Sequence, residues 1–135
     1  MSMTTAGLRR EPASPRLVLL VDDYEDTREL FAAVLEAAGF EVAQAEDARE
    51  ALRLAAERAP DIVVTDLSLP DMDGCELTRE LKSDGRTMEI PVLALSAHGS
   101  YARMRESIDA GCVAFVSKAR SPRFLAEEIR RVLET

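Results

Sequence analysis

Five short apolar segments alternate along the chain with five segments of helical periodicity. We expect strands at the apolar segments near 17–22, 40–45, 61–66, 91–95 and 112–117. We expect helices between and after them, near 25–38, 47–58, 74–83, 100–110 and 122–133. Short runs rich in valine, leucine and isoleucine are typical of strands that helices cover on both faces. The alternation therefore predicts an α/β domain built on a parallel sheet with right-handed crossovers.

The ends of two helices are marked by the residues around them. Gly39 follows the first helix, where glycine is a common terminator because it adopts left-handed backbone angles without strain. Ser121 and Pro122 precede the apolar face of the last helix. We expect Ser121 to cap this helix and Pro122 to occupy its first position.

Length and composition limit the organisation of the chain. Its 135 residues correspond to one domain, without internal repeats or linkers. Segment 1–15 is polar and lacks the apolar run of a signal peptide, so we expect a flexible tail followed by a domain at 16–135. We expect no second domain beyond the last helix.

Charge and cysteine content exclude several classes of function. A net charge of −8 argues against direct binding of nucleic acid, which requires a basic surface. No apolar stretch reaches the roughly 20 residues that a spanning helix needs, so we expect no membrane insertion. Cys75 and Cys112 suggest no disulfide framework. Two free thiols fit a reducing compartment, and we expect a cytoplasmic protein.

Reactive side chains stand where four of the predicted strands end. Asp22 and Asp23 follow the first strand, and Asp66 ends the third. Ser96 follows the fourth strand, and Lys118 follows the fifth. The carboxyl ends of parallel strands open on one crevice, so these side chains are expected to share a site.

Three carboxylates in one crevice would repel one another unless a cation lay between them. Magnesium suits an all-oxygen site with few protein ligands, because it retains water and accepts phosphate oxygens. The alternative for Asp23 is that it only caps the helix that follows. Asp66 is placed to attack phosphorus and form an acyl phosphate, with Lys118 as a neutralising ammonium and Ser96 as a hydroxyl donor. The crevice therefore predicts phosphoryl transfer.

Four motifs support this interpretation. They are Val21-Asp22-Asp23, the segment Asp66-Leu67-Ser68-Leu69-Pro70-Asp71-Met72-Asp73-Gly74, Ser96-Ala97, and Phe115-Val116-Ser117-Lys118. With them the chain resembles the receiver domain of two-component response regulators, from about Leu17 to Leu133. The resemblance implies a flavodoxin-like (βα)5 three-layer sandwich, with a five-stranded parallel sheet in the order 2-1-3-4-5.

The resemblance also implies a metal site and a phosphoacceptor. Asp66 would take a phosphoryl group from a histidine kinase or a phosphotransfer protein. Asp23 and Asp66 would bind Mg²⁺ directly, Asp22 would act mainly through water, and the Ser68 backbone carbonyl would be a further ligand. Ser68 and His98 would flank the path of the hydrolytic water and so modulate the lifetime of the phosphoryl group. For His98, an exposed loop residue without such a role is the alternative.

Two residues would carry the switch in this family. Ser96 would move toward the phosphoryl group, and Phe115 would change rotamer behind it. Because phenylalanine has no hydroxyl group, it gains no hydrogen bond by turning outward, so we expect Phe115 to keep an inward bias. The altered surface, at about 100–133 in this chain, would then bind a downstream protein target.

One position departs from the family. Receivers usually carry a proline after the lysine of the fifth strand, with a cis peptide bond between them, whereas Ala119 follows Lys118 here. A cis bond before a residue other than proline costs about 3 kcal/mol, so we expect a trans bond. We expect that bond to relocate the loop and alter how Lys118 reaches the site, shifting the switching equilibrium while phosphorylation survives.

We therefore expect a stand-alone, single-domain response regulator that signals by altered protein binding. It would catalyse only its own phosphorylation and dephosphorylation and would not turn over an external substrate. The alternatives are a receiver-fold interaction module that does not respond to phosphate, and a phosphate sink. Arginines and acidic residues alternate on the last two helices, but exposed ion pairs contribute little, so we expect a monomer or a weak homodimer.

Overall fold

The computed structural model describes residues 15–97 and 99–134 and contains one parallel sheet. Its strands are β2 (Leu17–Val21), β3 (Glu41–Ala45), β4 (Ile62–Asp66), β5 (Val92–Ser96) and β6 (Ala114–Ser117). They are ordered β3-β2-β4-β5-β6, and every neighbouring pair is parallel. Numbered along the chain, this is the expected order 2-1-3-4-5. The predicted flavodoxin-like architecture is confirmed.

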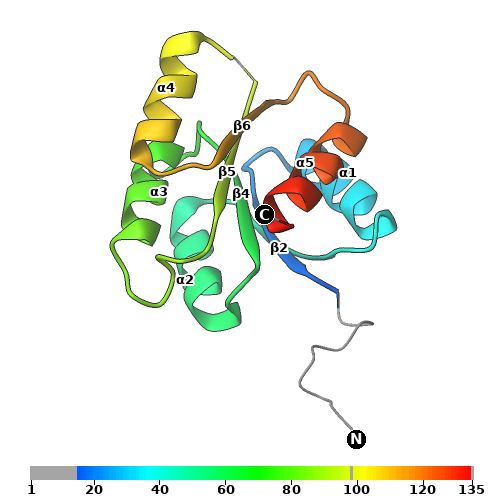
Figure 1. The fold of residues 1–135 in the computed structure, drawn as a ribbon, viewed down its shortest axis with the longest axis horizontal. Helices are drawn as coiled ribbons and strands as arrows, with labels where there is room; N and C mark the ends of the chain where they lie inside the picture. Colours follow the sequence, from blue (N-terminus) through cyan, green and yellow to red (C-terminus); the bar gives the residue numbers. More distant parts are fainter. Residues whose placement is uncertain (1–14, 98, 135) are drawn as a thin grey trace, which may run out of the picture.

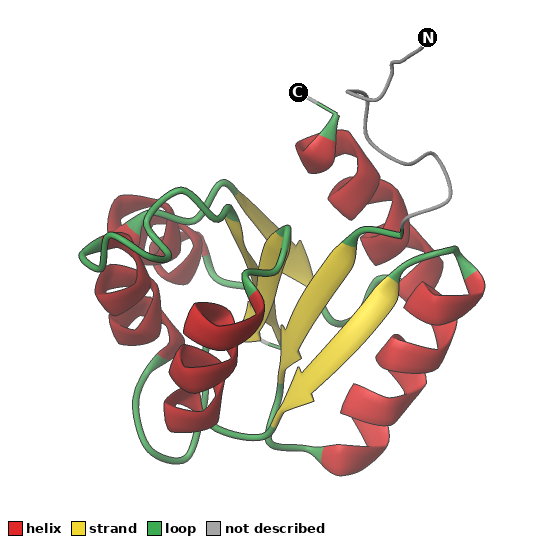
Figure 2. Ribbon diagram, turned by 90° about the horizontal axis from the view of Figure 1, so that it is seen from below, coloured by secondary structure: helices red, strands yellow, loops and turns green. Residues whose placement is uncertain are grey.

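Helices cover both faces of the sheet (Figures 1 and 2). They are α1 (Glu25–Ala37), α2 (Ala48–Arg58), α3 (Gly74–Lys82), α4 (Tyr101–Ala110) and α5 (Pro122–Leu133). Figure 1 shows α1 and α5 together on one side of the sheet and α2, α3 and α4 on the other. Each crossover between parallel strands therefore passes through a helix, as such connections require.

The hydrophobic core consists of two layers separated by the sheet. Val18 and Leu20 face the α1 and α5 side, whereas Leu19 and Val21 face the α2, α3 and α4 side. The central strand β4 is buried along its whole length, including Asp66. Since both faces are covered, the polar side chains of the central strands have room only at the strand ends. The fold thus concentrates them at one edge.

Local signals set the helix ends as expected. The hydroxyl of Ser121 accepts a hydrogen bond from the Phe124 amide, and Pro122 is the first residue of α5. Gly39 follows α1 with a φ of 103°, a backbone angle that glycine adopts without strain. The N-cap of α1 is Tyr24, and no side chain caps this helix. Asp23 therefore does not serve as the helix cap.

All five strands begin or end one or two residues from the expected positions, and the largest difference is in β6. β6 begins at Ala114 rather than at 112, because the Cys112 amide bonds to the Ser107 carbonyl and so closes α4 instead of joining the sheet. β5 extends to Ser96, where it pairs with Ser117. Residues 1–14 lie outside the described part, so the predicted tail stays a prediction. No helix among the described residues is long and apolar enough to cross a membrane.

Candidate functional site

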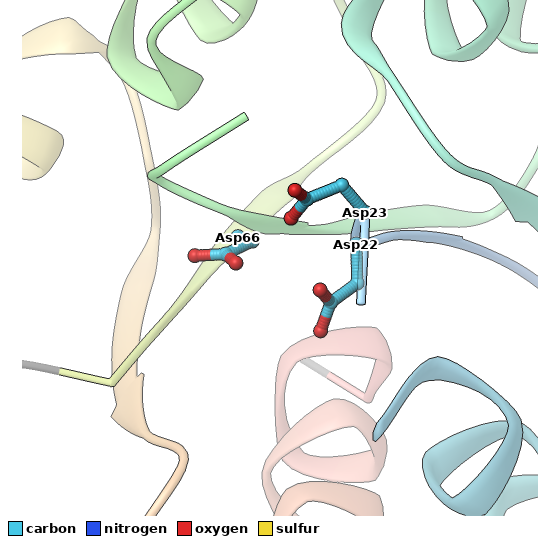
Figure 3. A group of neighbouring side chains, drawn as sticks. All are labelled: Asp22, Asp23 and Asp66. Carbon is cyan, nitrogen blue, oxygen red and sulfur yellow. The ribbon is translucent and has the colours of Figure 1, made fainter. Parts of the chain in front are cut away.

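The three aspartates lie together at the carboxyl ends of β2 and β4 (Figure 3). One carboxylate oxygen from each of Asp22, Asp23 and Asp66 lies within 4.8 Å of the other two. Asp22 and Asp66 are buried, with 1% and 7% of their surface exposed, whereas Asp23 is open to solvent. The described residues thus contain an acidic group that can hold a metal ion, accessible from the Asp23 side.

Lys118 joins two of these carboxylates. Its Nζ lies 2.8 Å from Oδ2 of Asp22 and 3.0 Å from Oδ2 of Asp66. Burial would lower the pKa of this ammonium group, but hydrogen bonds and charge from Asp22 and Asp66 outweigh burial, and the net shift is upward. Lys118 is therefore a fixed positive charge beside Asp66.

The loop after Lys118 holds the lysine in place without a proline. The Lys118–Ala119 peptide bond is trans, as expected. The Lys118 amide nevertheless donates to the Ser96 carbonyl at 2.8 Å, and the Ala119 amide donates to the Ser117 hydroxyl at 3.0 Å. These bonds keep the β6 register up to the site. Lys118 therefore reaches both carboxylates with a trans bond after it. The expected shift of the loop and of the switching equilibrium stays a prediction.

The environment of Asp22 fits a cation. Its Oδ1 accepts a hydrogen bond from the Tyr24 amide at 2.9 Å, and its backbone carbonyl accepts one from Arg28 at 2.8 Å. Its buried Oδ2 has no aligned hydrogen-bond donor, although the Lys118 ammonium lies close. A buried carboxylate oxygen with only an ion-pair contact retains capacity for a metal or a metal-bound water. The all-oxygen donors fit Mg²⁺ better than a soft metal.

Asp66 faces an open depression of about 370 Å³. The residues that line it are Asp66, Ser68, Ser96, Ala97, Ser100 and Arg103. Oδ1 of Asp66 accepts a hydrogen bond from the Ser68 amide at 3.1 Å, which fixes the carboxylate with one edge toward the depression. Ser96 is buried at its wall. The depression gives a small charged group direct access to the Asp66 carboxylate.

Comparison with known proteins identifies the family of this chain. Residues 18–130 match the family described as the response regulator receiver domain. The chain belongs to this family.

Curated relatives of this receiver domain differ in length. It is 39% identical to the polar-differentiation response regulator DivK of Brucella anthropi over 115 residues, 82% of this chain and 91% of DivK. It is 36% identical to the phosphate regulon transcriptional regulatory protein PhoB of Pseudomonas aeruginosa over 118 residues, 87% of this chain. The matched part is only 52% of PhoB, so the chain spans about half the length of that relative.

Solved receiver structures share the fold over nearly the whole chain. A response regulator of Chloroflexus aurantiacus has a TM-score of 0.86 at 30% identity and covers 90% of this chain and 100% of its own. The chemotaxis protein CheY4 of Vibrio cholerae has a TM-score of 0.83 at 29% identity and covers 88% of this chain and 99% of its own. The similarity to these receiver structures agrees with the strand order β3-β2-β4-β5-β6 of the sheet.

Two candidate residues remain, Phe115 and His98. Phe115 is half-buried and packs against the core layer on the α2, α3 and α4 side, an arrangement that fits the expected inward bias. A side chain at Gly99 would lie 3.5 Å from its ring. His98 lies outside the described residues, so its rate-modulating role stays a prediction.

The sequence did not predict the roles of several residues around the site. Gly74 begins α3, and a Cβ there would lie 2.4 Å from the Asp66 carbonyl oxygen, so only glycine fits. Asp71 accepts hydrogen bonds from the amides of Ala48 and Arg49, both at 2.9 Å. Asp71 and Gly74 both lie in the motif at 66–74, and that motif could have identified them. Nothing in the sequence marked Arg103, which reaches the site from α4.

Proposed function

We propose that the chain is a single-domain response regulator that is phosphorylated on Asp66 by a histidine kinase or a phosphotransfer protein. The observation that carries this proposal is the position of Lys118 between Asp22 and Asp66. A lone aspartate in an acidic group is a poor phosphoacceptor because its neighbours repel the incoming phosphate. A fixed ammonium beside it reduces that repulsion and stabilises the charge that is transferred.

The chemistry assigned to Asp66 is one covalent exchange. A carboxylate oxygen forms a bond to phosphorus, while the phosphorus–nitrogen bond of the donor phosphohistidine breaks and the imidazole nitrogen keeps the electron pair. Lys118 compensates the charge on the phosphoryl oxygens, and the hydroxyl of Ser96 donates to one of them. Attack by water on the acyl phosphate later restores the carboxylate and releases phosphate.

The residues that would hold Mg²⁺ are Asp23, Asp66 and the backbone carbonyl of Ser68, with Asp22 acting through water. A bound Mg²⁺ would neutralise the carboxylates and the phosphoryl oxygens together. Ser68, which is exposed beside Asp66, and His98 would control the access of water and so the lifetime of the acyl phosphate.

The output of the switch is assigned to the 100–133 surface. Ser96 and Phe115 would transmit phosphorylation to it, and a protein target would bind there. Tyr101, Ile108 and Val113 are large apolar side chains exposed on this surface, which supports a protein partner rather than nucleic acid. The protein would act as a monomer or a weak homodimer in the cytoplasm. The placement of Lys118 weighs against a module that ignores phosphate.

The proposal is tested by intact mass spectrometry after incubation with acetyl phosphate and Mg²⁺. Wild type is expected to gain a single phosphoryl group, and the gain should require Mg²⁺ and disappear in Asp66→Asn. A folded wild-type protein that gains no phosphoryl group, from acetyl phosphate or from a kinase donor, would contradict the proposal. A rapidly lost adduct would indicate the phosphate-sink alternative.

A further inference from the structure

Arg103 is a half-buried cation that connects α4 to the loop after the phosphoacceptor. Its Nη2 donates to Oδ2 of Asp73 at 2.6 Å and to the backbone carbonyl of Leu67 at 3.2 Å. Its Nη1 donates to Glu106, one turn further along α4, at 2.7 Å. Only 23% of the Arg103 side chain is exposed. The planar guanidinium thus holds several acceptors in one fixed geometry.

The Leu67 carbonyl is the important acceptor because of its position in the chain. Leu67 lies between Asp66 and Ser68, whose carbonyl is assigned to the metal. The same Leu67 oxygen accepts a hydrogen bond from the Gly74 amide at 2.8 Å. Two donors, one from α3 and one from α4, therefore fix the peptide that follows the phosphoacceptor.

Asp73 ties the other end of this loop to the same guanidinium. Its Oδ1 accepts from the Cys75 amide at 2.7 Å, capping α3, while its Oδ2 bonds to Arg103. An isolated bridge pairs Ser68 with Asp73, so the loop closes on itself. Arg103 also lines the depression that contains Asp66. Arg103 therefore adds a link from both ends of the loop to α4.

We propose that Arg103 is a positioning residue of the phosphoacceptor site, which fixes the Leu67–Ser68 backbone relative to Asp66 by tying it to α4. The inference rests on the proposed function, since it concerns the rate of phosphorylation of Asp66. It assigns a role to a residue that does not itself touch the reacting carboxylate. Loss of the tie would displace both the carboxylate and the Ser68 carbonyl.

A simpler explanation is that Arg103 acts only through its positive charge. The two explanations differ for Arg103→Lys, which keeps the charge but loses the planar fork that holds Asp73 and Leu67 together. Positioning predicts that Arg103→Lys and Arg103→Gln are impaired alike. A charge effect predicts that Arg103→Lys behaves as wild type.

The experiment compares wild type, Arg103→Lys, Arg103→Gln, Asp73→Asn and Glu106→Gln. Asp73→Asn keeps an oxygen that can cap α3, and Glu106→Gln removes only the negative charge on the far side of the guanidinium. The first readout is the rate at which acetyl phosphate and Mg²⁺ give the phosphoryl adduct. The second is a Mg²⁺ titration followed by the backbone amide NMR signals of residues 66–68, which needs no phosphodonor. Melting curves report folding in parallel.

We expect both Arg103 variants and Asp73→Asn to form the adduct about tenfold more slowly, because small displacements of reacting groups are costly. The Mg²⁺ dissociation constant is expected to rise about tenfold in the same three variants, because the backbone next to the Ser68 ligand is displaced. Glu106→Gln should stay within about twofold of wild type in both readouts. Combining Arg103→Gln with Asp73→Asn should add little, since both remove one contact.

Three results would overturn the inference. They are wild-type rates and metal affinity in Arg103→Lys, equal impairment in Glu106→Gln, and a lowered melting temperature without any change in the other readouts. If Arg103→Gln does not fold, Arg103→Lys and Asp73→Asn still decide the question. If wild type forms no adduct at all, the proposed function fails, whereas an adduct with unchanged rates and metal affinity in the Arg103 variants contradicts only this inference.

Discussion

The positive charge of Lys118 compensates the negative charges of two carboxylates in the site. Lys118 lies between the buried carboxylates of Asp22 and Asp66. The Oδ2 atom of Asp22 has no other polar contact of good geometry. Removing one partner of such a group leaves an uncompensated charge in a water-poor environment. The lysine therefore contributes to folding as well as to the proposed chemistry. Because the folded pKa of Lys118 is raised above its ordinary value of 10.5, this contribution is complete below that value and is lost as pH rises through the folded pKa.

Lys118→Met is expected to lower the free energy of unfolding by about 3 kcal/mol without Mg²⁺ and to abolish rapid adduct formation. Because the carboxylates then lack their ammonium partner, Mg²⁺ should restore more stability in the variant than in wild type. Urea unfolding with and without Mg²⁺ measures this difference. Lys82→Met is the matched control, since Lys82 is the other lysine and bonds only to backbone carbonyls outside the site. An equal Mg²⁺ response in the two variants would contradict the charge balance described here.

Gly74 limits the site by its lack of a side chain. A Cβ at this position would meet two backbone atoms, the Asp66 carbonyl oxygen at 2.4 Å and the Leu67 Cα at 2.7 Å. Backbone cannot move aside cheaply, so Gly74→Ala is expected to cost about 3 kcal/mol of stability and to slow phosphorylation. Gly85→Ala is the control, because nothing lies within 4 Å of its Cβ position. Urea unfolding and adduct kinetics test both variants, and near-equal stability of the two would contradict the close approach.

The elements around the site are joined by one loop, the segment between β4 and α3. Asp71 in this loop bonds to the first amides of α2, Asp73 caps α3, and Arg103 joins the loop to α4. Three helices therefore meet at the loop that follows Asp66. A change of charge at Asp66 is placed to act on all three through this loop.

Asp71→Ala is expected to lower the free energy of unfolding by about 1 kcal/mol at pH 7, because two amides at the start of α2 lose their acceptor. The Ala48 and Arg49 amide bonds hold the pKa of Asp71 below its ordinary value of 3.8, although burial opposes them. A lowered pKa gives stability that is complete above the unfolded pKa and is lost as pH falls through the folded one. The difference in the free energy of unfolding between Asp71→Ala and wild type should thus vanish in strong acid. A difference that persists unchanged at pH 2 would refute the capping role.

The order of elements was predictable because each strand and helix carries its own local signal. Apolar runs marked β2, β4 and β5, and Ser121 with Pro122 marked the start of α5. The missed features depend on contacts between distant segments. The late start of β6 follows from the Cys112 amide bonding to the Ser107 carbonyl, and Arg103 reaches Leu67 across 36 positions of sequence. No periodicity reports such contacts.

The candidate site was predictable for a related reason. A parallel sheet brings the carboxyl ends of its strands together, so residue type at each strand end was enough to assemble Asp22, Asp66, Ser96 and Lys118. The contacts of Lys118 could not be predicted from the peptide bond before Ala119 alone. The Lys118 amide donates to the Ser96 carbonyl of the neighbouring strand, which is a contact between distant segments, and the Ala119 amide donates locally to the Ser117 hydroxyl.

At the scale of the whole molecule, the proposed binding of Mg²⁺ would be coupled to folding. A ligand that binds only the folded protein stabilises it by an amount that grows with concentration, about 2.7 kcal/mol at 100 times its dissociation constant. Mg²⁺ is therefore expected to raise the melting temperature of wild type in a dose-dependent way. Asp23→Asn should reduce this effect, because Asp23 is proposed to bind Mg²⁺ directly. Asp23 is exposed, so the substitution itself should cost little folding energy. An undiminished Mg²⁺ response in Asp23→Asn would exclude Asp23 as a ligand.

The most direct test of the account maps the phosphoryl group to one residue. The protein is phosphorylated with acetyl phosphate and Mg²⁺, and the acyl phosphate is reduced with borohydride, which converts the modified aspartate to homoserine. Peptide mass spectrometry then reads the residue at each aspartate position. The account predicts homoserine at position 66 alone. Reduction at Asp22 or Asp23 instead, or no reduced residue despite a phosphoryl adduct on the intact protein, would contradict it.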